Sequence, residues 1–213
     1  MTRLRPSIAV WGYDRTRPLL DGRVKVEGCE PVWLSEMPIE TMFARALGGA
    51  EFDVSELSFS NYLKQTAAGD CAYVGLPIFP SRSFRHGAWF VNADSGIGTP
   101  ADLKGRRVGV REYSMTAAVV ARGVLSDEFG VPADAIQWVV GDVDERERDA
   151  IPIPDLPPGF TVERAPDSAL LSDMLLKGGI DALLAYKPPK AFLAGDSRVR
   201  RLFPDYAERE MRY

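Results

Sequence analysis

Residues 105–125 read GRRVGVREYSMTAAVVARGVL, and this stretch indicates the fold. Residues 105–110 predict a strand, and the residues after Met115 predict a helix, because apolar side chains recur there at helical spacing. Gly130 is expected to end that helix. Its expected buried stripe comprises Ala117, Val120, Ala121, Val124 and Leu125. A strand that leads directly into a helix is typical of parallel α/β sheets.

The same alternation precedes and follows this stretch. Short apolar runs predict strands at residues 7–13, 32–34, 54–57, 74–78, 137–140, 160–162 and 181–185. Helices are expected between them, the clearest with its apolar stripe at Ile39, Met42, Phe43, Ala46 and Leu47. The acidic, proline-rich residues 142–158 are expected to form a solvated loop rather than a cation site.

The chain is therefore expected to be an α/β protein with two lobes, each built on a mainly parallel sheet. The most apolar strand, at residues 88–92, is expected to cross between the lobes. We place lobe 1 at residues 1–87, lobe 2 at 88–186 and a return region toward the hinge at 187–213. Open α/β sheets bind ligands at the carboxyl ends of their strands, so a cleft holding a small anion is expected.

The composition narrows the class of protein. The chain is 46% hydrophobic and 26% charged, as in ordinary globular domains, and its net charge of −4 argues against a nucleic-acid partner. The sequence contains no apolar run long enough for a membrane span and no signal-like apolar segment near Met1, so we expect a cytoplasmic protein without a membrane partner. Cys29 and Cys71 are expected to be free thiols.

The common cofactor and catalytic motifs are absent from the sequence. It has no P-loop, no dinucleotide-binding glycine motif, no zinc-binding pattern and no nucleophile elbow of a serine hydrolase. A single histidine cannot build a multi-histidine metal site. We therefore expect neither a metal nor another cofactor.

The most prominent candidate site residues lie between residues 81 and 86, just before the apolar strand. Ser81, Arg82 and Arg85 are candidates for substrate binding, because planar guanidinium groups form paired hydrogen bonds with carboxylates. The alternative is that both arginines pair with acids on the surface. His86 is a candidate for proton transfer, although a lone histidine more often has a structural role.

Further candidates occur where predicted strands end and helices begin. Free backbone N–H groups at helix N-termini bind anions, although the hydroxyl groups there also serve as simple caps. Asp14 and Arg15 lie at the end of the first predicted strand, and Lys187 lies at the end of the last one. The substrate-binding candidates of this group are Arg15, Ser58, Ser60, Tyr113, Ser114, Met115, Thr116 and Lys187, and the acids are Asp14 and Glu112.

Several of these segments together resemble the 4,5-dihydroxyphthalate decarboxylase family. The segments are GYDRTRPLLDGRV (12–24), FDVSELSFSNYL (52–63), IFPSRSFRHGAWFVN (78–92), DLKGRRVGVREYSMTAAVVARGVL (102–125) and RRLFPDY (200–206). The first and third are fairly specific, whereas DLKGRRVGV is widespread among solute receptors. The resemblance implies a type II periplasmic-binding-protein-like fold.

The resemblance also implies an activity, the loss of CO2 from 4,5-dihydroxyphthalate or a related aromatic dicarboxylate to give 3,4-dihydroxybenzoate. This carboxy-lyase chemistry requires a base, an acid and a cationic clamp, without a cofactor. The clamp is assigned to Arg82 and Arg85 with the helix start at Ser114 and Thr116. His86 is assigned to proton transfer, with Asp14, Glu56 or Glu112 as the second titrating group.

Two alternatives remain open at the level of sequence, a non-catalytic solute-binding protein and a truncated, inactive paralogue. The same fold and clamp suit a non-catalytic solute-binding protein for a small aromatic or carboxylate anion, of the type that serves ABC transporters. Members of the resembled family also continue beyond the point where this sequence ends, so lobe 1 is expected to lack its return segment. We expect the apolar surface left there to bind a second copy or a complementing chain.

Overall fold

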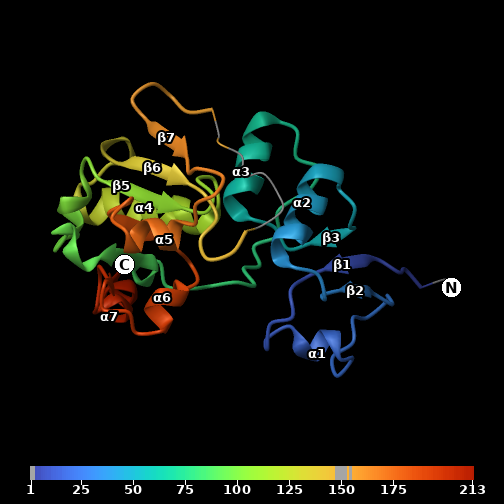
Figure 1. The fold of residues 1–213 in the computed structure, drawn as a ribbon. Coiled ribbons are helices and arrows are strands. Elements are labelled where there is room, and N and C mark those ends of the chain that lie inside the picture. The colour runs from blue at the N-terminus through green and yellow to red at the C-terminus, as the bar shows by residue number, and fades with distance from the viewer. Residues whose placement is uncertain (1–2, 147–152, 154) are drawn as a thin grey trace. The chain divides into compact units, whose positions relative to one another are not determined.

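The computed structural model describes residues 3–146, 153 and 155–213 of the chain (Figure 1). The chain divides into two compact units, a first unit at Met1–Arg82 and a second unit at Ser83–Tyr213. The division lies a few residues before the expected lobe boundary at 87/88, so Arg85 and His86 belong to the second unit.

The first unit contains a small parallel sheet. Its strands have the order β2-β1-β3, and β1 pairs in parallel with both neighbours. Helix α2 covers it with Met42 and Ala46, which join Ala9 and Phe52 in the buried core. The elements are β1 (Ser7–Ala9), α1 (Arg17–Leu20), β2 (Val32–Leu34), α2 (Ile39–Gly49), β3 (Val54–Ser55) and α3 (Phe59–Ala68).

The expected strand at residues 74–78 does not form, and this expectation was wrong. Val74, Leu76 and Ile78 alternate as in a strand, but their side chains are exposed by 63% to 89%. An alternating pattern becomes a strand only where the backbone finds a pairing partner.

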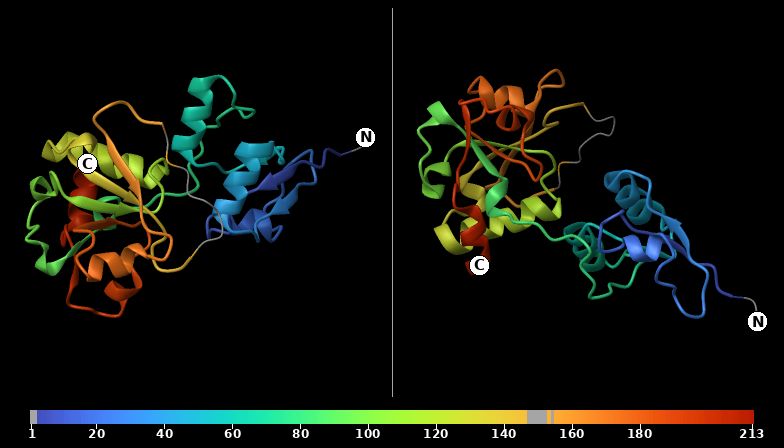
Figure 2. Two further views of the ribbon diagram at one scale, coloured as in Figure 1. Left: turned by 45° about the horizontal axis from the view of Figure 1, so that its top comes forward. Right: turned by 90° about the horizontal axis from the view of Figure 1, so that it is seen from below.

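The second unit contains a mixed sheet of six strands in the order β7-β6-β5-β8-β4-β9 (Figures 1 and 2). Strands β5, β6, β7 and β8 pair in parallel, and β4 pairs antiparallel with β8 and β9. The strands are β4 (Trp89–Asn92), β5 (Arg107–Val110), β6 (Gln137–Val140), β7 (Thr161–Arg164), β8 (Ala182–Leu184) and β9 (Val199–Arg201). The helices are α4 (Thr116–Phe129), α5 (Leu171–Leu176), α6 (Lys190–Leu193) and α7 (Tyr206–Arg212).

Strand β4, which was expected to cross between lobes, lies wholly within this sheet with all four residues buried. Residues 187–213, expected to return toward the hinge, instead add β9 and α7 to the second unit. The continuous apolar run around Trp89 reflects burial on both faces of the sheet.

Helix α4 packs the expected way with one exception. Ala117, Ala121, Val124 and Leu125 are buried, but Val120 is 38% exposed and Ala118 takes its place in the core.

Gly109 in β5 allows the neighbouring core side chains to pack against the strand, because an added Cβ would lie 2.7 Å from Ile180 Cδ1.

Candidate active site

The carboxyl ends of β1 and β3 lie side by side, because these strands pair at Ile8–Val54 and Ala9–Ser55. Glu56 follows β3 directly, and its carboxylate is held from two sides. The Tyr13 hydroxyl donates to Oε1 at 2.7 Å, and the Trp11 backbone N–H donates to Oε2 at 3.2 Å. The two donors fix the orientation of this acid at the edge of the sheet where open α/β proteins bind ligands.

Arg15 lies against the same tyrosine. Its guanidinium carbon is 4.1 Å from the centre of the Tyr13 ring, and its Nε donates to the Pro80 carbonyl. Burial raises the pKa of Tyr13 to about 12, with the hydrogen bond to Glu56 acting in the same direction and the Ser81 hydroxyl opposing it. The phenol therefore keeps its proton at neutral pH. Arg15 and Ser81, both predicted from sequence, thus meet around Tyr13.

Helix α3 begins at this edge. Ser58 is the N-cap residue and is 8% exposed, and its Oγ lies 3.4 Å from Ser60 Oγ in the first turn. Ser58 and Ser60, both predicted from sequence, therefore follow Glu56 in the segment that leads from β3 into α3. We name the group Tyr13, Arg15, Glu56, Ser58 and Ser81 the first edge cluster.

Asp14 is the exception among the predicted residues near Tyr13. Its side chain is 94% exposed, and the nearest ionic partner is Arg15 NH1 at 3.9 Å. A carboxylate so open to water is held weakly, because exposed ion pairs contribute little.

The second unit has a comparable edge where β5, β6 and β8 end. Glu112 follows β5, and the Ser114 hydroxyl donates to its Oε1 at 2.6 Å. Thr116 is the first residue of α4, and the N-cap position belongs to Met115, which packs partly against the core. The expectation that Ser114 or Thr116 caps this helix is therefore wrong, but both lie at its N-terminus.

Sequence reasoning missed two acids at this edge. Asp142 lies close to Arg111, with Oδ1 3.4 Å from Nε and side chains only 20% and 17% exposed. Asp144 accepts hydrogen bonds from the Ser172 hydroxyl at 2.5 Å and from the Lys190 backbone N–H at 3.2 Å. Their position directly after a buried strand was the available signal. The loop expected at 142–158 lies in part outside the described residues.

Lys187 follows β8 at the same edge. It is exposed, with its ammonium 5.3 Å from the centre of the Tyr186 ring. A cation on a long side chain near a strand end is suited to attract an anion.

Tyr113, predicted to bind substrate, instead belongs to the core. It is 4% exposed, its ring lies 5.6 Å from that of Trp138, and the Arg122 guanidinium carbon lies 3.7 Å from its centre. Burial raises the pKa of its hydroxyl. The aromatic ring of Tyr113 packs in the core beside β5, although the side chain ends in a polar hydroxyl group.

The two arginines assigned to a single clamp fall in different units. Arg82 is exposed at the end of the first unit. Arg85 is partly buried in the second unit, where burial lowers the pKa of its guanidinium and the nearby Glu210 opposes that effect. Their closeness in sequence therefore does not define a paired site within either unit.

His86, assigned to proton transfer, is fully buried inside the second unit. Its Nδ1 lies 2.7 Å from Glu210 Oε2, and its Nε2 lies 3.0 Å from Glu128 Oε2. The Arg85 and His86 backbone N–H groups also donate to Glu210 Oε2, at 2.8 and 2.9 Å. With both ring nitrogens engaged and no exposed surface, the imidazole links α4 and α7 and offers nothing to a substrate. Its role in this arrangement is structural.

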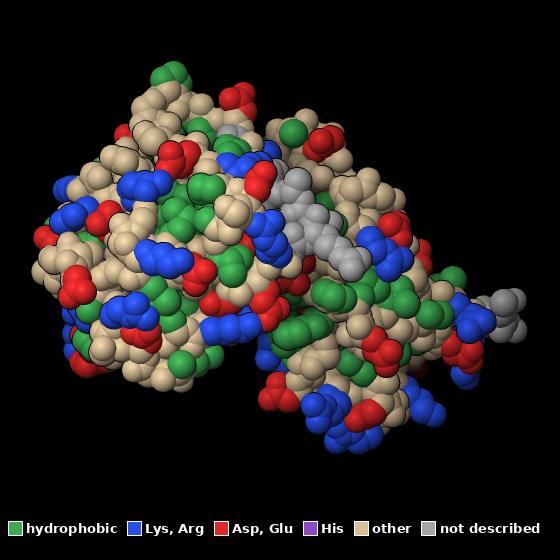
Figure 3. Space-filling view, viewed as in Figure 1, with side chains coloured by type: hydrophobic (Ala, Val, Ile, Leu, Met, Phe, Trp, Pro, Cys, Tyr) green, Lys and Arg blue, Asp and Glu red, His purple; other side chains and the backbone are tan. Residues whose placement is uncertain are grey.

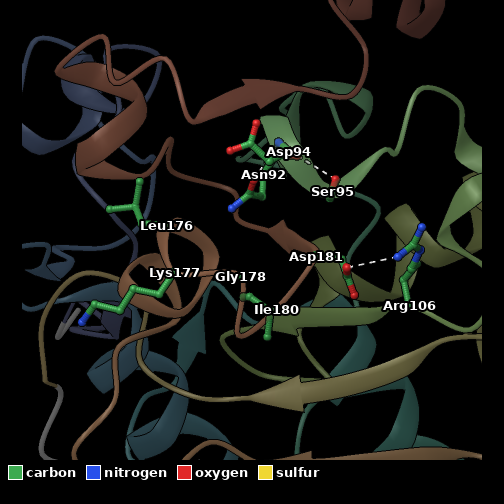
Figure 4. Close-up of a pocket in the computed structure, with 9 residues that line it drawn as sticks. All are labelled: Asn92, Asp94, Ser95, Arg106, Leu176, Lys177, Gly178, Ile180 and Asp181. Carbon is green, nitrogen blue, oxygen red and sulfur yellow. Dashed lines mark hydrogen bonds and ion pairs between the residues drawn. The ribbon is translucent and has the colours of Figure 1, made fainter.

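A depression of about 400 Å³ opens at the opposite edge of the second sheet, where β5 and β8 begin (Figure 4). Its polar groups serve the protein itself: Arg106 NH1 lies 3.4 Å from Asp181 Oδ1, and Asn92 Nδ2 donates to the Leu175 carbonyl at 2.6 Å. None of the predicted site residues lines it. This position also lies away from the carboxyl ends of the parallel strands.

Within the described part of the chain, no three His, Cys, Asp or Glu side chains are grouped so that they could hold a metal ion. Among the same residues, no helix has the length and apolar character needed to cross a bilayer.

Comparison with solved structures identifies the fold. The periplasmic aliphatic sulphonate binding protein from Escherichia coli superposes with a TM-score of 0.56 at 19% identity, covering 94% of this chain and 60% of that one. The alkanesulfonate-binding protein from Xanthomonas axonopodis pv. citri, bound to MOPS, gives a TM-score of 0.52 at 18% identity, with the same coverages. The expected type II periplasmic-binding-protein-like fold is confirmed.

Comparison with curated proteins identifies relatives in sequence. No family model matches the chain. A 4,5-dihydroxyphthalate decarboxylase from Comamonas testosteroni is 44% identical over 205 residues, which are 96% of this chain and 62% of that protein. A protein of the same name from Pseudomonas putida is 42% identical over 205 residues, covering 96% of this chain and 79% of the relative. The chain thus spans less than two thirds of the Comamonas protein. With this identity along nearly its whole length, the chain belongs to the 4,5-dihydroxyphthalate decarboxylase family.

Proposed function

We propose that the protein is a carboxy-lyase that converts 4,5-dihydroxyphthalate, or a closely related aromatic dicarboxylate, into 3,4-dihydroxybenzoate and CO2. The observation that supports this is identity of 42% to 44%, over 205 residues, with two proteins that carry this activity in their names. The chemistry of the first edge cluster is compatible with it.

The reaction has three requirements. A base removes the proton from the ring hydroxyl para to the departing carboxylate, so that electrons reach the ring carbon bearing that carboxylate. That carbon then takes up a proton, and the bond to the carboxylate breaks to release CO2. Cationic groups hold the second carboxylate, which loses its hydration in the site and needs ionised partners.

The first edge cluster offers both kinds of group. Glu56 is an oriented carboxylate, and Arg15 is a half-exposed guanidinium in contact with the same tyrosine ring. The hydroxyl groups of Ser58, Ser60 and Ser81 are further hydrogen-bonding groups of this edge. For the clamp we propose Arg15 first, with Arg82, Arg85 and Lys187 as the cations to be compared with it.

Incubation of the protein with 4,5-dihydroxyphthalate, with CO2 release and 3,4-dihydroxybenzoate formation followed beside calorimetric binding, tests the proposal. Both products in equal amounts are expected. Binding without CO2 release would favour a solute-binding role, which the likeness to two sulphonate-binding proteins in fold makes the second candidate. Absence of both binding and turnover would contradict the proposed function.

We further propose that the protein acts in the cytoplasm. Cys29 and Cys71 are free thiols, and free cysteine pairs suit a reducing compartment. Fractionation of the cells that express the protein tests this, and recovery from the periplasm would contradict it.

We also propose that the protein forms a homo-oligomer through the first unit. Val74, Leu76 and Ile78 are 89%, 63% and 69% exposed on an extended segment without strand partners, and Figure 3 shows hydrophobic side chains on the surface of this unit. Extended chain with exposed apolar residues is a template for pairing with a second copy. Light scattering should give a dimer mass for the parent and a monomer mass for Leu76→Lys. A monomeric parent would contradict this.

A further inference from the structure

The carboxylate of Glu56 combines partial burial with a fixed orientation. Its own backbone N–H donates to the Ala9 carbonyl at 2.8 Å, which ties the start of the segment after β3 to β1. Its two oxygens accept from the Tyr13 hydroxyl at 2.7 Å and from the Trp11 N–H at 3.2 Å. Each carboxylate oxygen has two lone pairs, so both retain capacity for one more donor.

Tyr13 is suited to orient this acid rather than to exchange protons. The raised pKa of about 12 means that its hydroxyl stays protonated throughout the neutral range and continues to donate. The ring itself is held by Trp11, with ring centres 5.4 Å apart at 84°, and by the guanidinium of Arg15 at 4.1 Å. The Pro80 carbonyl anchors that guanidinium in turn. A base supported in this way changes position little when it takes up a proton.

The other titrating candidates lack this combination. Asp14 has a 94% exposed side chain. His86 is buried with carboxylates at both ring nitrogens. Glu112 accepts from Ser114 at 2.6 Å, and it belongs to the second unit, away from the group around Tyr13 in the chain.

We propose that Glu56 is the catalytic residue that accepts the ring-hydroxyl proton of the substrate, and that Tyr13 is the positioning residue that holds it. This inference rests on the proposed function. The hydroxyl O–H bond breaks and its proton goes to a Glu56 oxygen. The electron pair left on the phenolate oxygen moves through the ring, and the carbon para to it takes a proton from water.

The rest of the reaction needs neither an oxidant nor a reductant. The bond between that carbon and the carboxylate breaks, CO2 leaves, and the electron pair of the bond restores the aromatic ring. The proton held by Glu56 returns to the phenolate oxygen. The water that supplied the proton remains as hydroxide, so the net change converts the substrate and one water into 3,4-dihydroxybenzoate, CO2 and hydroxide, and Glu56 ends as the carboxylate with which it began.

The test compares Glu56→Gln, Tyr13→Phe and a matched control, Glu51→Gln. Glu51 is an acid of the same unit that is paired with Arg45 at 2.8 Å, outside the first edge cluster. The expected loss of kcat for Glu56→Gln is about 100-fold or more, with KM changed much less, since general base catalysis contributes at least this factor. Glu51→Gln should retain the parent kcat.

Tyr13→Phe gives a readout that a merely structural role would not move. Removing the hydroxyl takes away the donor that orients Glu56 Oε1, so kcat should fall while KM changes much less. Bound substrate also reports directly, because an ionised catechol absorbs at longer wavelength than a neutral one. The parent should red-shift the bound ligand, and Glu56→Gln should bind it without that shift.

The outcomes separate this inference from the proposed function. A parent that neither binds nor decarboxylates 4,5-dihydroxyphthalate overturns the proposed function, and the inference falls with it. An active parent with a Glu56→Gln variant of unchanged kcat and unchanged ligand spectrum overturns the inference alone. If Glu56→Gln fails to fold, Tyr13→Phe decides, and an unchanged kcat of that variant overturns the inference.

Discussion

The two units of this chain are stabilised in different ways. The buried core of the first unit consists of Ala9, Met42, Ala46 and Phe52. The second unit has a six-stranded sheet with buried hydrophobic clusters on both faces. Buried apolar area supplies most of the stabilisation of a domain, so the second unit should be the more stable of the two.

Polar links compensate in part for the small core of the first unit. The Tyr73 hydroxyl donates to the Phe52 carbonyl at 2.9 Å, and Asp53 Oδ2 accepts from the Ser7 N–H and hydroxyl at 2.8 and 2.7 Å. The Tyr62 hydroxyl accepts from the Gly75 N–H at 2.8 Å. The unit that carries the first edge cluster is thus the one that depends more on hydrogen bonds than on apolar packing.

The largest expected effect comes from a core residue of the second unit. Phe90 is fully buried, and its ring lies 5.0 Å from that of Phe192. Phe90→Ala should lower the free energy of unfolding by about 3–5 kcal/mol. Denaturant unfolding followed by circular dichroism should show the loss in the later of two transitions. Met42→Ala, the counterpart in the first unit, should shift only the earlier one, and a single shared transition for both variants would break the comparison.

A smaller effect is expected from the buried histidine. His86→Gln cannot satisfy both Glu210 and Glu128, whose side chains are 15% and 29% exposed. Leaving a buried acceptor unsatisfied costs about 1–3 kcal/mol, and the loss should appear in the second-unit transition. Turnover by the folded variant should match the parent. A variant of parental stability with much lower kcat would instead restore the proton-transfer assignment.

A still smaller effect is expected from a polar link of the first unit. Tyr73→Phe removes one hydroxyl and its hydrogen bond to Phe52, which should cost about 0.5–1.5 kcal/mol in the earlier transition. Hydrogen exchange of the Phe52 and neighbouring amides would locate the change. Unaltered exchange in the first unit would mean that its polar links contribute little.

The smallest expected effect is on how the stability of the folded protein changes with pH in the acidic range. Hydrogen bonds from Ser7 lower the pKa of Asp53 below 3.8, and hydrogen bonds from Thr99 and Gly98 do the same for Asp102 in the second unit. A lowered folded-state pKa stabilises the protein above about pH 4, and this contribution disappears as the pH falls further. Thermal unfolding of Asp53→Asn and Asp102→Asn should vary less with pH below 4 than that of the parent. Equal pH dependence in all three proteins would contradict the assignment.

The fold was predictable because the sequence patterns that indicate its strands and helices are local. The strand and helix in residues 105–125 are read from a continuous apolar run and from helical spacing, and both depend on neighbours within a few residues. The failure at residues 74–78 has the same origin, since the alternation is present and only a distant partner strand is missing. The expected boundary at 87/88 lies a few residues after the division at Arg82. A strand that is buried on both faces has the same apolar sequence whether it lies inside one sheet or crosses between two lobes.

The site was predictable in part, for a related reason. The positions of Arg15, Ser58 and Glu56 after strand ends were predictable because parallel strands place their carboxyl ends together, and their roles stay predictions. The enclosure of His86 was not predictable because its partners lie 42 and 124 residues away along the chain. No local signal distinguishes an imidazole enclosed by two glutamates from one that faces a substrate.

The four tryptophans of the chain are divided evenly between the two units. Trp89 and Trp138 are fully buried in the second unit, whereas Trp11 is 43% exposed in the first, with Trp33 partly buried. Buried indoles emit at shorter wavelengths and are shielded from acrylamide, and exposed indoles emit further to the red and are readily quenched. The intrinsic fluorescence therefore contains a separate optical signal for each unit, and Trp11 reports from beside the Glu56 carboxylate without any label.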